Sequence, residues 1–500
     1  MSLAILHCRA QYGSDAPPVT IEVFLSGGLP AFTIVGMAET AVRESKDRVR
    51  GALLSSGFEF PQQRITVSLG PAEMKKSGGR YDLAIALGIL ACKKHFPKDT
   101  LDNVEVYGEL SLSGGIRPVP AILPAVLQAA AAGRRAIVPK DNELEASLAG
   151  TRVYAAASLT AIAAHLSGRE LIEAAAKTDF AKVDPTANDL ADVRGQQRAK
   201  RALEIAAAGG HNLLFIGPPG TGKSMLARRL PGILPAMSND EALQTAAIES
   251  VLGMPVAMNG WRQRPFRSPH HTASAAALVG GGPGPRPGEI SRAHNGVLFL
   301  DELPEFNRRA LEVLREPLET GRISIARAGG QAEYPARFQL IAAMNPCPCG
   351  YLGDRLADCR CSADRVAAYR RKISGPLLDR IDLHVEVLRP STDALRASAA
   401  DGEKSRVVQA RVERAWSIQM QRSGVSNARL DGTNLDAVCA VGDAAWALLE
   451  NATERFNLSA RAHQRVLRVA RTIADLAGAE KLMPPHIAEA LSLRCLDRQT

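Results

Sequence analysis

One stretch of eight residues constrains this chain more than any other. It reads Gly217-Pro218-Pro219-Gly220-Thr221-Gly222-Lys223-Ser224, after an apolar run at 213–216 and before a helix-like segment at 225–230. A strand, a glycine-rich turn and a helix form a P-loop, in which backbone N–H groups and a helix N-terminus surround phosphate oxygens. We therefore predict that the stretch binds ATP, with Lys223 at the β- and γ-phosphates and Ser224 on Mg²⁺. A chance match in a glycine-rich turn is the alternative, and the flanking segments argue against it.

The composition favours a cytoplasmic protein with several domains. The chain has 500 residues, of which 46% are hydrophobic and only 4% aromatic, so aliphatic side chains must fill its cores. The net charge of +9 is compatible with a polyanion partner but does not require one. We read neither a signal peptide nor an uncharged apolar stretch of about 18 residues, and we expect no membrane contact.

The pattern of strands and helices predicts a multidomain α/β protein. Residues 1–168 read as an α+β block that contains a helix over 41–56 and a strand over 105–110, and residues 169–188 read as a linker. Residues 189–389 read as the P-loop α/β core, and residues 390–500 as an all-α lid with one of its helices over 437–456.

Two acidic residues end a second buried strand, about eighty residues after the P-loop. Asp301 and Glu302 follow the apolar run at 297–300, as in a Walker B motif. Parallel sheets bind ligands at the carboxyl ends of their strands. We expect Asp301 to hold Mg²⁺ through water and Glu302 to polarise the attacking water. The alternative is a pair of solvated loop carboxylates.

Two further polar residues are candidates for nucleotide chemistry. Asn345 ends the apolar strand at 338–344, and its amide can hydrogen-bond the γ-phosphate or the water, although Asn before Pro is also a common turn. Arg380 offers a planar cation that could stabilise a transferring phosphoryl group. Its alternative is an ion pair with Asp379 or Asp382.

Four cysteines lie within fifteen residues and form a C-x-C, nine residues, C-x-C pattern. They are Cys347, Cys349, Cys359 and Cys361. Four thiolates suit tetrahedral Zn²⁺ in a reducing cytosol, so we predict a structural zinc site. Unmetallated thiols and a redox pair are the alternatives.

Two insertions interrupt the core. The first, at 267–291, contains His270-His271, for which we favour a conformational or pore-loop role over metal binding. The second, at 321–338, reads as a hairpin with its turn at 329–330. Arg322 and Arg327 on this hairpin could contact a nucleic-acid backbone, or they could be solvated charges.

The first block resembles the ribosomal-S5-like fold of the Lon protease domain. The resemblance rests on residues 69–73, 81–88, 108–110 and 114–119. Arg117 stands where the resemblance places the catalytic lysine, and arginine does not deprotonate near neutral pH. We therefore expect an inactive domain without protease activity. Ser77 as a displaced nucleophile is the alternative.

Taken together, the blocks resemble the ComM/YifB family of magnesium-chelatase-like AAA+ ATPases. The resemblance implies a homo-hexameric, ATP-dependent DNA motor that promotes branch migration in homologous recombination and natural transformation. It also implies roles for single residues: Gln196 against the adenine, Asn345 as sensor 1, Arg380 as a finger that reaches the neighbouring subunit's nucleotide, and Arg461 as sensor 2 on the γ-phosphate. The alternative function is a motor subunit that drives metal insertion in a chelatase or remodels a protein partner.

Overall fold

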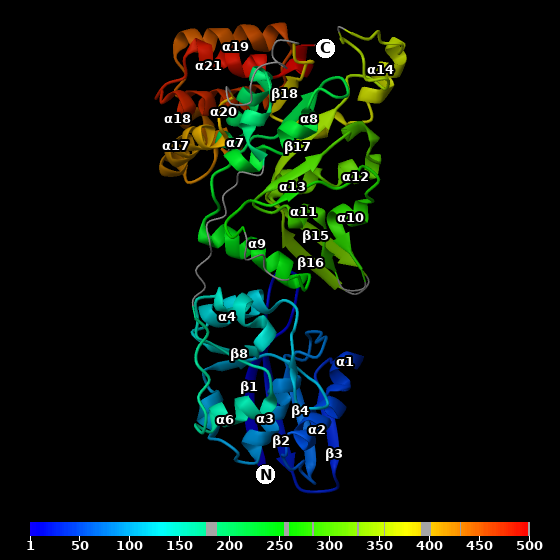
Figure 1. Ribbon diagram of the computed structural model, residues 1–500, viewed down its shortest axis with the longest axis vertical. Coiled ribbons are helices and arrows are strands. Elements are labelled where there is room, and N and C mark those ends of the chain that lie inside the picture. The colour runs from blue at the N-terminus through cyan, green and yellow to red at the C-terminus, as the bar shows by residue number, and fades with distance from the viewer. Residues whose placement is uncertain are drawn as a thin grey trace.

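The computed structural model describes residues 1–176, 188–254, 260–282, 285–327, 330–354, 356–391, 402–430 and 432–498. The molecule is elongated (Figure 1): an N-terminal α/β region lies at one end, a P-loop core in the middle, and a group of helices beside the core at the other end. The predicted multidomain α/β architecture, with a parallel sheet and a helical C-terminal region, is confirmed. Within the described residues, no helix combines the length and hydrophobicity needed to cross a bilayer.

The N-terminal region is built on a seven-stranded sheet. Its strands, in spatial order, are β3 (Ala31–Val35), β4 (Arg64–Gly70), β2 (Pro18–Ser26), β1 (Ser2–Arg9), β5 (Val104–Val106), β8 (Arg135–Pro139) and β9 (Val153–Ala156). A small hairpin, β6 (Glu109–Leu110) with β7 (Ile116–Arg117), adjoins it. The predicted single strand over 105–110 is therefore wrong: β5 and β6 belong to different sheets. Buried and less buried residues alternate along β2 and β4, so one face of the sheet carries the core.

Six helices accompany this sheet. They are α1 (Thr40–Arg43), α2 (Ser45–Ser55), α3 (Asp82–Cys92), α4 (Ile122–Ala131), α5 (Glu143–Ser147) and α6 (Leu159–Leu166). Every residue of α3 is buried, because this helix is apolar all round and packs against β1 and β2. The helix predicted over 41–56 is divided into α1 and α2 at Glu44.

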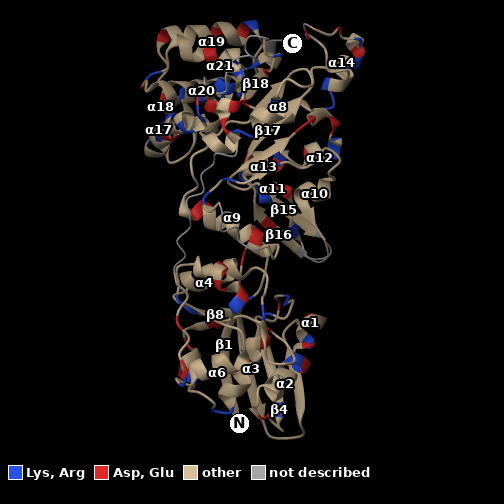
Figure 2. Ribbon diagram, in the orientation of Figure 1, with Lys and Arg blue, Asp and Glu red and all other residues tan. Residues whose placement is uncertain are grey.

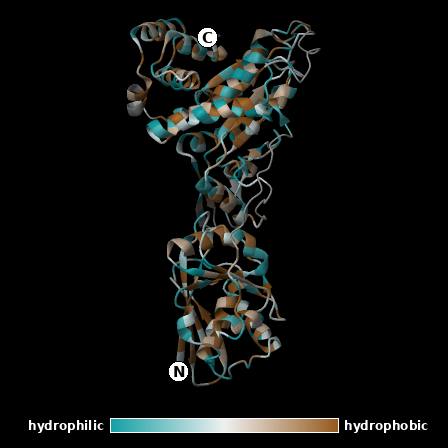
Figure 3. Ribbon diagram, turned by 60° about the vertical axis from the view of Figure 1, so that its left-hand side comes forward, coloured by the Kyte–Doolittle hydropathy of each residue, from teal (hydrophilic) through white to brown (hydrophobic). Residues whose placement is uncertain are grey.

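The core contains a five-stranded sheet in which every neighbouring pair is parallel. The strands, in spatial order, are β11 (Phe266–Arg267), β14 (Val297–Leu300), β17 (Gln339–Met344), β10 (Leu213–Ile216) and β18 (Leu383–Glu386). All residues of β10, β14 and β17 are buried, as expected for parallel strands covered on both faces. Figure 3 shows hydrophobic residues in the strands of both the N-terminal and the core sheets.

Short and medium helices surround the core sheet. They are α7 (Gln197–Gly209), α8 (Lys223–Ala227), α9 (Asn239–Val251), α12 (Arg308–Glu312), α13 (Arg315–Thr320), α14 (Ala363–Arg370) and α15 (Gly375–Leu378). The first insertion forms α10 (Ala275–Val279), β12 (Gly280–Gly281), β13 (Arg286–Pro287) and α11 (Glu289–Arg292). The second forms the predicted hairpin of β15 (Arg322–Arg327) and β16 (Gly330–Pro335). Gly329 of the turn predicted at 329–330 lies outside the described residues, and Gly330 begins β16. Residues 177–187 of the predicted linker also lie outside the described residues.

The C-terminal region is helical. Its helices are α17 (Ser405–Ser423), α18 (Gly432–Cys439), α19 (Asp443–Arg455), α20 (Ala460–Ala477) and α21 (Pro484–Ser492). The helix predicted over 437–456 is wrong, because Ala440 takes a left-handed conformation (φ 39°) between α18 and α19. Ser459 caps α20 as predicted, and its side chain accepts a hydrogen bond from the Ala462 N–H.

Among the described residues, the N-terminal region contacts the core at α9 and at β16. The first joins α4 to α9: Ser250 accepts a hydrogen bond from the Ala121 N–H at its carbonyl (2.8 Å) and one from the Leu123 N–H at its hydroxyl (3.2 Å). The second joins the loop at 12–15 to β16, where the Ser14 hydroxyl donates to the Glu333 carbonyl (3.3 Å). Figure 1 shows α4 directly below α9 and β16.

Candidate nucleotide-binding site

The P-loop connects β10, which lies between β17 and β18, to the N-terminus of α8. Two of its glycines are dictated by local geometry. A Cβ at Gly217 would lie 2.1 Å from the Val387 carbonyl oxygen, and Gly222 has φ 92°, which favours glycine at the start of α8. The loop therefore closes around its own lysine, as the sequence predicts for a phosphate cradle.

Lys223 lies at the centre of the cradle. Its ammonium group donates to the carbonyls of Gly217 (2.7 Å) and Pro218 (2.9 Å) and to Asn345 Oδ1 (3.2 Å). Burial lowers its pKa to about 8, although the charges of Asp301 and Glu302 act in the opposite direction. Burial removes water that would stabilise the charged ammonium group. The negative oxygens of a bound triphosphate would stabilise that charge instead.

The two acidic residues of the predicted Walker B motif lie beside the P-loop. The Ser224 hydroxyl donates to Asp301 Oδ2 (2.5 Å), so the two predicted Mg²⁺ contacts are neighbours. Hydroxyl and carboxylate oxygens are suitable donors for Mg²⁺, which prefers oxygen ligands. Glu302 has a left-handed backbone (φ 53°) at the start of η6 (Leu303–Glu305), and its carboxylate is half-exposed. The structure thus brings Lys223, Ser224, Asp301, Glu302 and Asn345 to one edge of the sheet.

Gln196 also reaches the P-loop. Its side-chain amide donates to the Thr221 carbonyl (3.1 Å) and to the Leu388 carbonyl (2.7 Å). These bonds fix the segment before α7 against the phosphate cradle. The adenine contact of Gln196 stays a prediction.

A histidine of the first insertion contacts the candidate catalytic base. His271 Nδ1 lies 3.1 Å from Glu302 Oε2, and the His271 ring lies against the His270 ring with centroids 4.1 Å apart and the two planes tilted by 33°. The sequence predicted a conformational or pore-loop role for His270-His271 without locating either residue. The order of the strands could have indicated this contact. His271 follows β11 closely, β11 pairs with β14, and Asp301 and Glu302 come directly after β14.

Replacing His271 with alanine is expected to raise the basal ATPase rate about two- to fivefold. The contact with His271 competes with water and nucleotide for the Glu302 carboxylate, and a partly exposed polar contact contributes up to about 1 kcal/mol. Steady-state phosphate release without DNA measures the effect, and His95→Ala is the control because this exposed histidine lies in the N-terminal region and contacts Phe58 instead. A rate equal to or below that of the unaltered chain would contradict this role.

Arg380 and Arg461 lie at the other edge of the sheet. The Arg380 carbonyl accepts a hydrogen bond from the Asn212 side chain (2.8 Å), and Asn212 precedes β10, whereas the P-loop follows β10. Arg461 lines a cavity together with Arg380. The two arginines are therefore separated from Lys223 of the same chain by the length of β10, about 13 Å for four residues.

The ion-pair partner of Arg380 differs from the two that its sequence neighbours suggested. Arg380 pairs with Glu319 at the end of α13 and donates to the Pro376 carbonyl (2.7 Å). Asp382 is instead bound by Arg465 of α20 (2.7 Å). The pair with Glu319 would have to open before Arg380 could reach a nucleotide.

The four cysteines of the predicted zinc site converge. Their sulfur atoms all lie within 4.8 Å of one another, and three of the distances are 3.3, 3.6 and 3.6 Å. Zinc–sulfur bonds of about 2.3 Å place tetrahedral ligands about 3.8 Å apart, so the geometry fits Zn²⁺. Hydrogen bonds from backbone groups of Tyr351 and Arg360 lower the pKa of Cys349, whereas the neighbouring thiols raise the pKa of Cys359 and Cys361. Gly350 of this element packs against Pro219 of the P-loop.

The structure describes the side chain of one of the two hairpin arginines. Arg322 is exposed and pairs with Glu333 across the hairpin (2.5 Å). The side chain of Arg327 lies outside the described residues. The predicted DNA contacts of both residues stay predictions.

The family of the chain follows from its matches to known proteins. Residues 189–395 match the model "Magnesium chelatase, subunit ChlI", residues 21–142 match "Subunit ChlI of Mg-chelatase", and residues 402–494 match "Magnesium chelatase, subunit ChlI C-terminal". The uncharacterized protein YifB of Salmonella typhimurium is 49% identical over 100% of this chain and 98% of its own length. The competence protein ComM of Haemophilus influenzae is 48% identical with the same coverage. The chain belongs to the ComM/YifB family of magnesium-chelatase-like proteins.

A more distant relative separates this family from a chelatase subunit. The magnesium-chelatase 38 kDa subunit of Cereibacter sphaeroides is 26% identical over 30% of this chain and 51% of its own length. The ComM/YifB relatives match along the whole chain, including the N-terminal region. The predicted family membership is thereby confirmed.

For this member of the ComM/YifB family, we expect one zinc ion per chain. Replacing Cys347 with serine removes one of four thiolates from the site and should reduce bound zinc to less than about a tenth per chain after dialysis. Elemental analysis of purified protein measures the content. Cys439→Ser is the control, because Cys439 is buried among the C-terminal helices. Full zinc content in the Cys347→Ser chain, or none in the unaltered chain, would contradict the assignment.

Proposed function

We propose that this chain forms a homo-hexameric, ATP-dependent DNA motor that promotes branch migration during homologous recombination and natural transformation. The observation that carries the proposal is the division of the ATP machinery between two edges of one sheet. Lys223, Ser224, Asp301, Glu302 and Asn345 meet at the carboxyl edge, and Arg380 lies at the amino edge. Members of the magnesium-chelatase-like AAA+ family are ATPases, and these residues supply the parts that such a reaction needs.

A ring explains why the parts are divided. Arg380 precedes β18, whereas the P-loop follows β10, and these two strands pair in parallel, so the two groups lie at opposite ends of the paired strands. A second copy can offer its amino edge to the first copy's nucleotide. Arg461 shares the cavity of Arg380, so we propose that both arginines act on the neighbour's nucleotide rather than on their own. Repeating this head-to-tail contact generates a closed ring.

The proposed DNA substrate rests on the relative and on charge. The relative from Haemophilus influenzae is named a competence protein, and the chain has a net charge of +9. The hairpin of β15 and β16 carries arginines, and α14 beside the four cysteines contains Arg365 and Arg370. A polyanion that threads a ring would encounter such groups, which bind phosphate without reading sequence.

ATPase stimulation by DNA tests the function directly. We expect branched DNA to raise the ATPase rate more than duplex or single-stranded DNA, and we expect ATP to drive exchange in a three-strand junction. Lys223→Ala serves as the control that should lose both activities. A chain that hydrolyses ATP at a rate unaffected by all three DNA forms would contradict the motor.

A chelatase motor is the second candidate, and the match of residues 189–395 to a chelatase subunit favours it. In that reaction Mg²⁺ would be inserted into a porphyrin, which is a substrate and not DNA. A porphyrin-metallation assay beside the junction assay separates the two candidates. We also propose that the N-terminal region is not a protease, since Arg117 pairs with Glu109 (3.5 Å) where a lysine base would be needed. Casein turnover that disappears in Ser77→Ala would contradict this.

A further inference from the structure

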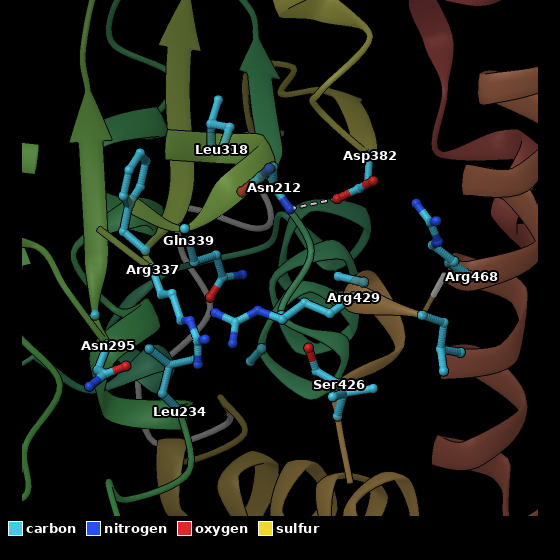
Figure 4. Close-up of a pocket in the computed structure, with 18 of the residues that line it drawn as sticks. Asn212, Leu234, Asn295, Leu318, Arg337, Gln339, Asp382, Ser426, Arg429 and Arg468 are labelled. Atoms are coloured by element: carbon cyan, nitrogen blue, oxygen red, sulfur yellow. Dashed lines mark hydrogen bonds between the residues drawn. The ribbon is translucent and has the colours of Figure 1, made fainter. Parts of the chain in front are cut away.

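A large cavity lies between the core and the C-terminal helices. Its volume is about 1110 Å³, and its core side is formed at the amino ends of the core strands, where Asn212 and Gln339 lie. The C-terminal region contributes Trp416 of α17 and Arg429 of η8 (Asn427–Arg429). Figure 4 shows core residues on one side and α20 on the other. The P-loop follows β10, so this cavity is at the edge of the sheet away from the P-loop.

The cavity lining is rich in arginine: it contains Arg262, Arg264, Arg337, Arg380, Arg429, Arg461, Arg465 and Arg468. Three of these arginines have a carboxylate partner among the described residues. Arg264 pairs with Glu241 (3.2 Å), Arg380 with Glu319 and Arg465 with Asp382 (2.7 Å). Figure 2 shows basic residues gathered around α18 and α20. The cavity thus holds more positive charge than its carboxylates balance.

Two of these arginines point toward one another in the cavity. Figure 4 shows the guanidinium groups of Arg337 and Arg429 approaching each other from the core and from the C-terminal region. Among the ion pairs of the described residues, neither arginine has a carboxylate partner. Burial and then the charge of Arg337 lower the pKa of Arg429, against the opposite effect of Glu241. Glu241 already accepts hydrogen bonds from Arg264 and from the Ser238 N–H (2.9 Å). Its carboxylate is therefore shared, and it neutralises Arg337 and Arg429 poorly.

The position of this pair is fixed from both sides. The backbone N–H of Arg337 donates to His294 Nδ1 (3.0 Å). Burial, and then the charges of Arg337 and Arg429, lower the pKa of His294 to about 3. The imidazole therefore stays neutral near pH 7 and adds no charge to the cavity. Arg429 ends η8, whose residue Asn427 is bound by Arg422 (2.8 Å). Two like charges are thus held close together by their surroundings, and a bound anion would relieve their repulsion.

We propose that Arg337 and Arg429 form a second anion site, which binds a phosphate-bearing small molecule in this cavity. Planar guanidinium groups bind phosphate oxygens in pairs, and two facing groups can hold one polyphosphate from both sides. The volume is at the upper end of the range for small-molecule pockets, about 300–1,000 Å³. The half-buried Trp416 lies in the same lining, and the Arg264 guanidinium lies over its ring, 5.8 Å from the ring centroid. The site lies at the edge of the sheet away from this chain's own P-loop. Because Arg380 and Arg461 of the same cavity are proposed to meet the neighbour's nucleotide, the test uses a Lys223→Ala background, which removes the P-loop lysine from every chain.

Calorimetric titration of the full chain carrying Lys223→Ala tests the site without interference from the P-loop. Inorganic tripolyphosphate and ADP are the two probes. We expect one binding event per chain for tripolyphosphate, and we expect R337Q/R429Q in the same background to weaken it at least about tenfold. The double variant R43Q/R152Q removes two exposed arginines of the N-terminal region and should leave the affinity unchanged. Circular dichroism and thermal unfolding check that the variants fold.

The two probes distinguish the sources of the phosphate group. Tighter binding of ADP identifies a nucleotide that uses its base, and tighter binding of tripolyphosphate identifies the phosphate chain alone; either result supports the site. Loss of all binding in Lys223→Ala, or equal binding by the R337Q/R429Q chain, would overturn it. A DNA oligonucleotide that needs Arg337 and Arg429 while tripolyphosphate does not bind would also overturn it, by identifying a nucleic-acid contact instead.

Discussion

Replacing Glu302 with glutamine is expected to leave ATP binding intact and to lower the ATPase rate by about a thousandfold. An amide keeps the shape of the side chain but cannot accept the proton of the attacking water, and general-base catalysis contributes about 10²–10⁴-fold. Lys223, Ser224 and Asp301 are untouched, so the phosphate cradle and the Mg²⁺ contacts remain. Phosphate release measures the rate, and titration with a fluorescent ATP analogue measures binding.

Glu305 supplies the matched control for this substitution. It lies in the same short helix, η6, but pairs with Lys372 (3.3 Å) instead of facing His271. Glu305→Gln should therefore hydrolyse ATP within about twofold of the unaltered chain, since an exposed ion pair contributes little. Equal losses of ATPase activity in Glu302→Gln and Glu305→Gln would show that Glu302 is not the general base.

Replacing Arg380 with alanine is expected to lower the ATPase rate by about a thousandfold or more while ATP binding persists. A guanidinium beside the transferring phosphoryl group contributes about 10³–10⁵-fold to related reactions. The loss should be partly reversed by mixing Arg380→Ala chains with Glu302→Gln chains. In a mixed ring, some contacts join an intact Glu302 of one chain to an intact Arg380 of the next.

The mixing experiment separates a role between chains from a role within one chain. If Arg380 served its own nucleotide, every chain in the mixture would carry a lesion and no activity would return. Arg371→Ala, at an exposed position on the same approach to α15, is the control that should retain activity. Full-speed hydrolysis by a dilute, single chain would contradict the shared site altogether.

The nucleotide-binding residues could be predicted because each follows a buried strand. Lys223, Asp301 and Asn345 are far apart in sequence, yet β10, β14 and β17 are parallel neighbours, so their carboxyl ends meet. Parallel pairing therefore turns three local patterns into one site. The hairpin of β15 and β16 was equally local, and its two strands lie within the segment 321–338 that was read as a hairpin.

Contacts between distant segments could not be predicted in the same way. The partner of Arg380 was sought among its sequence neighbours Asp379 and Asp382, but Asp382 is bound from the C-terminal region and Glu319 comes from α13. The contact of His271 with Glu302 depends on how the first insertion folds back over the sheet. No periodicity encodes such a path, because it is decided by tertiary packing.

The paired attachment of the N-terminal region has a mechanical consequence. Contacts at both Ser250 and Glu333 restrict how the N-terminal region can turn against the core more than either contact alone would. Glu333 belongs to the β15–β16 hairpin and Ser250 to a helix that begins soon after the P-loop. A conformational change that moves the hairpin relative to α9 would therefore also tilt the N-terminal sheet.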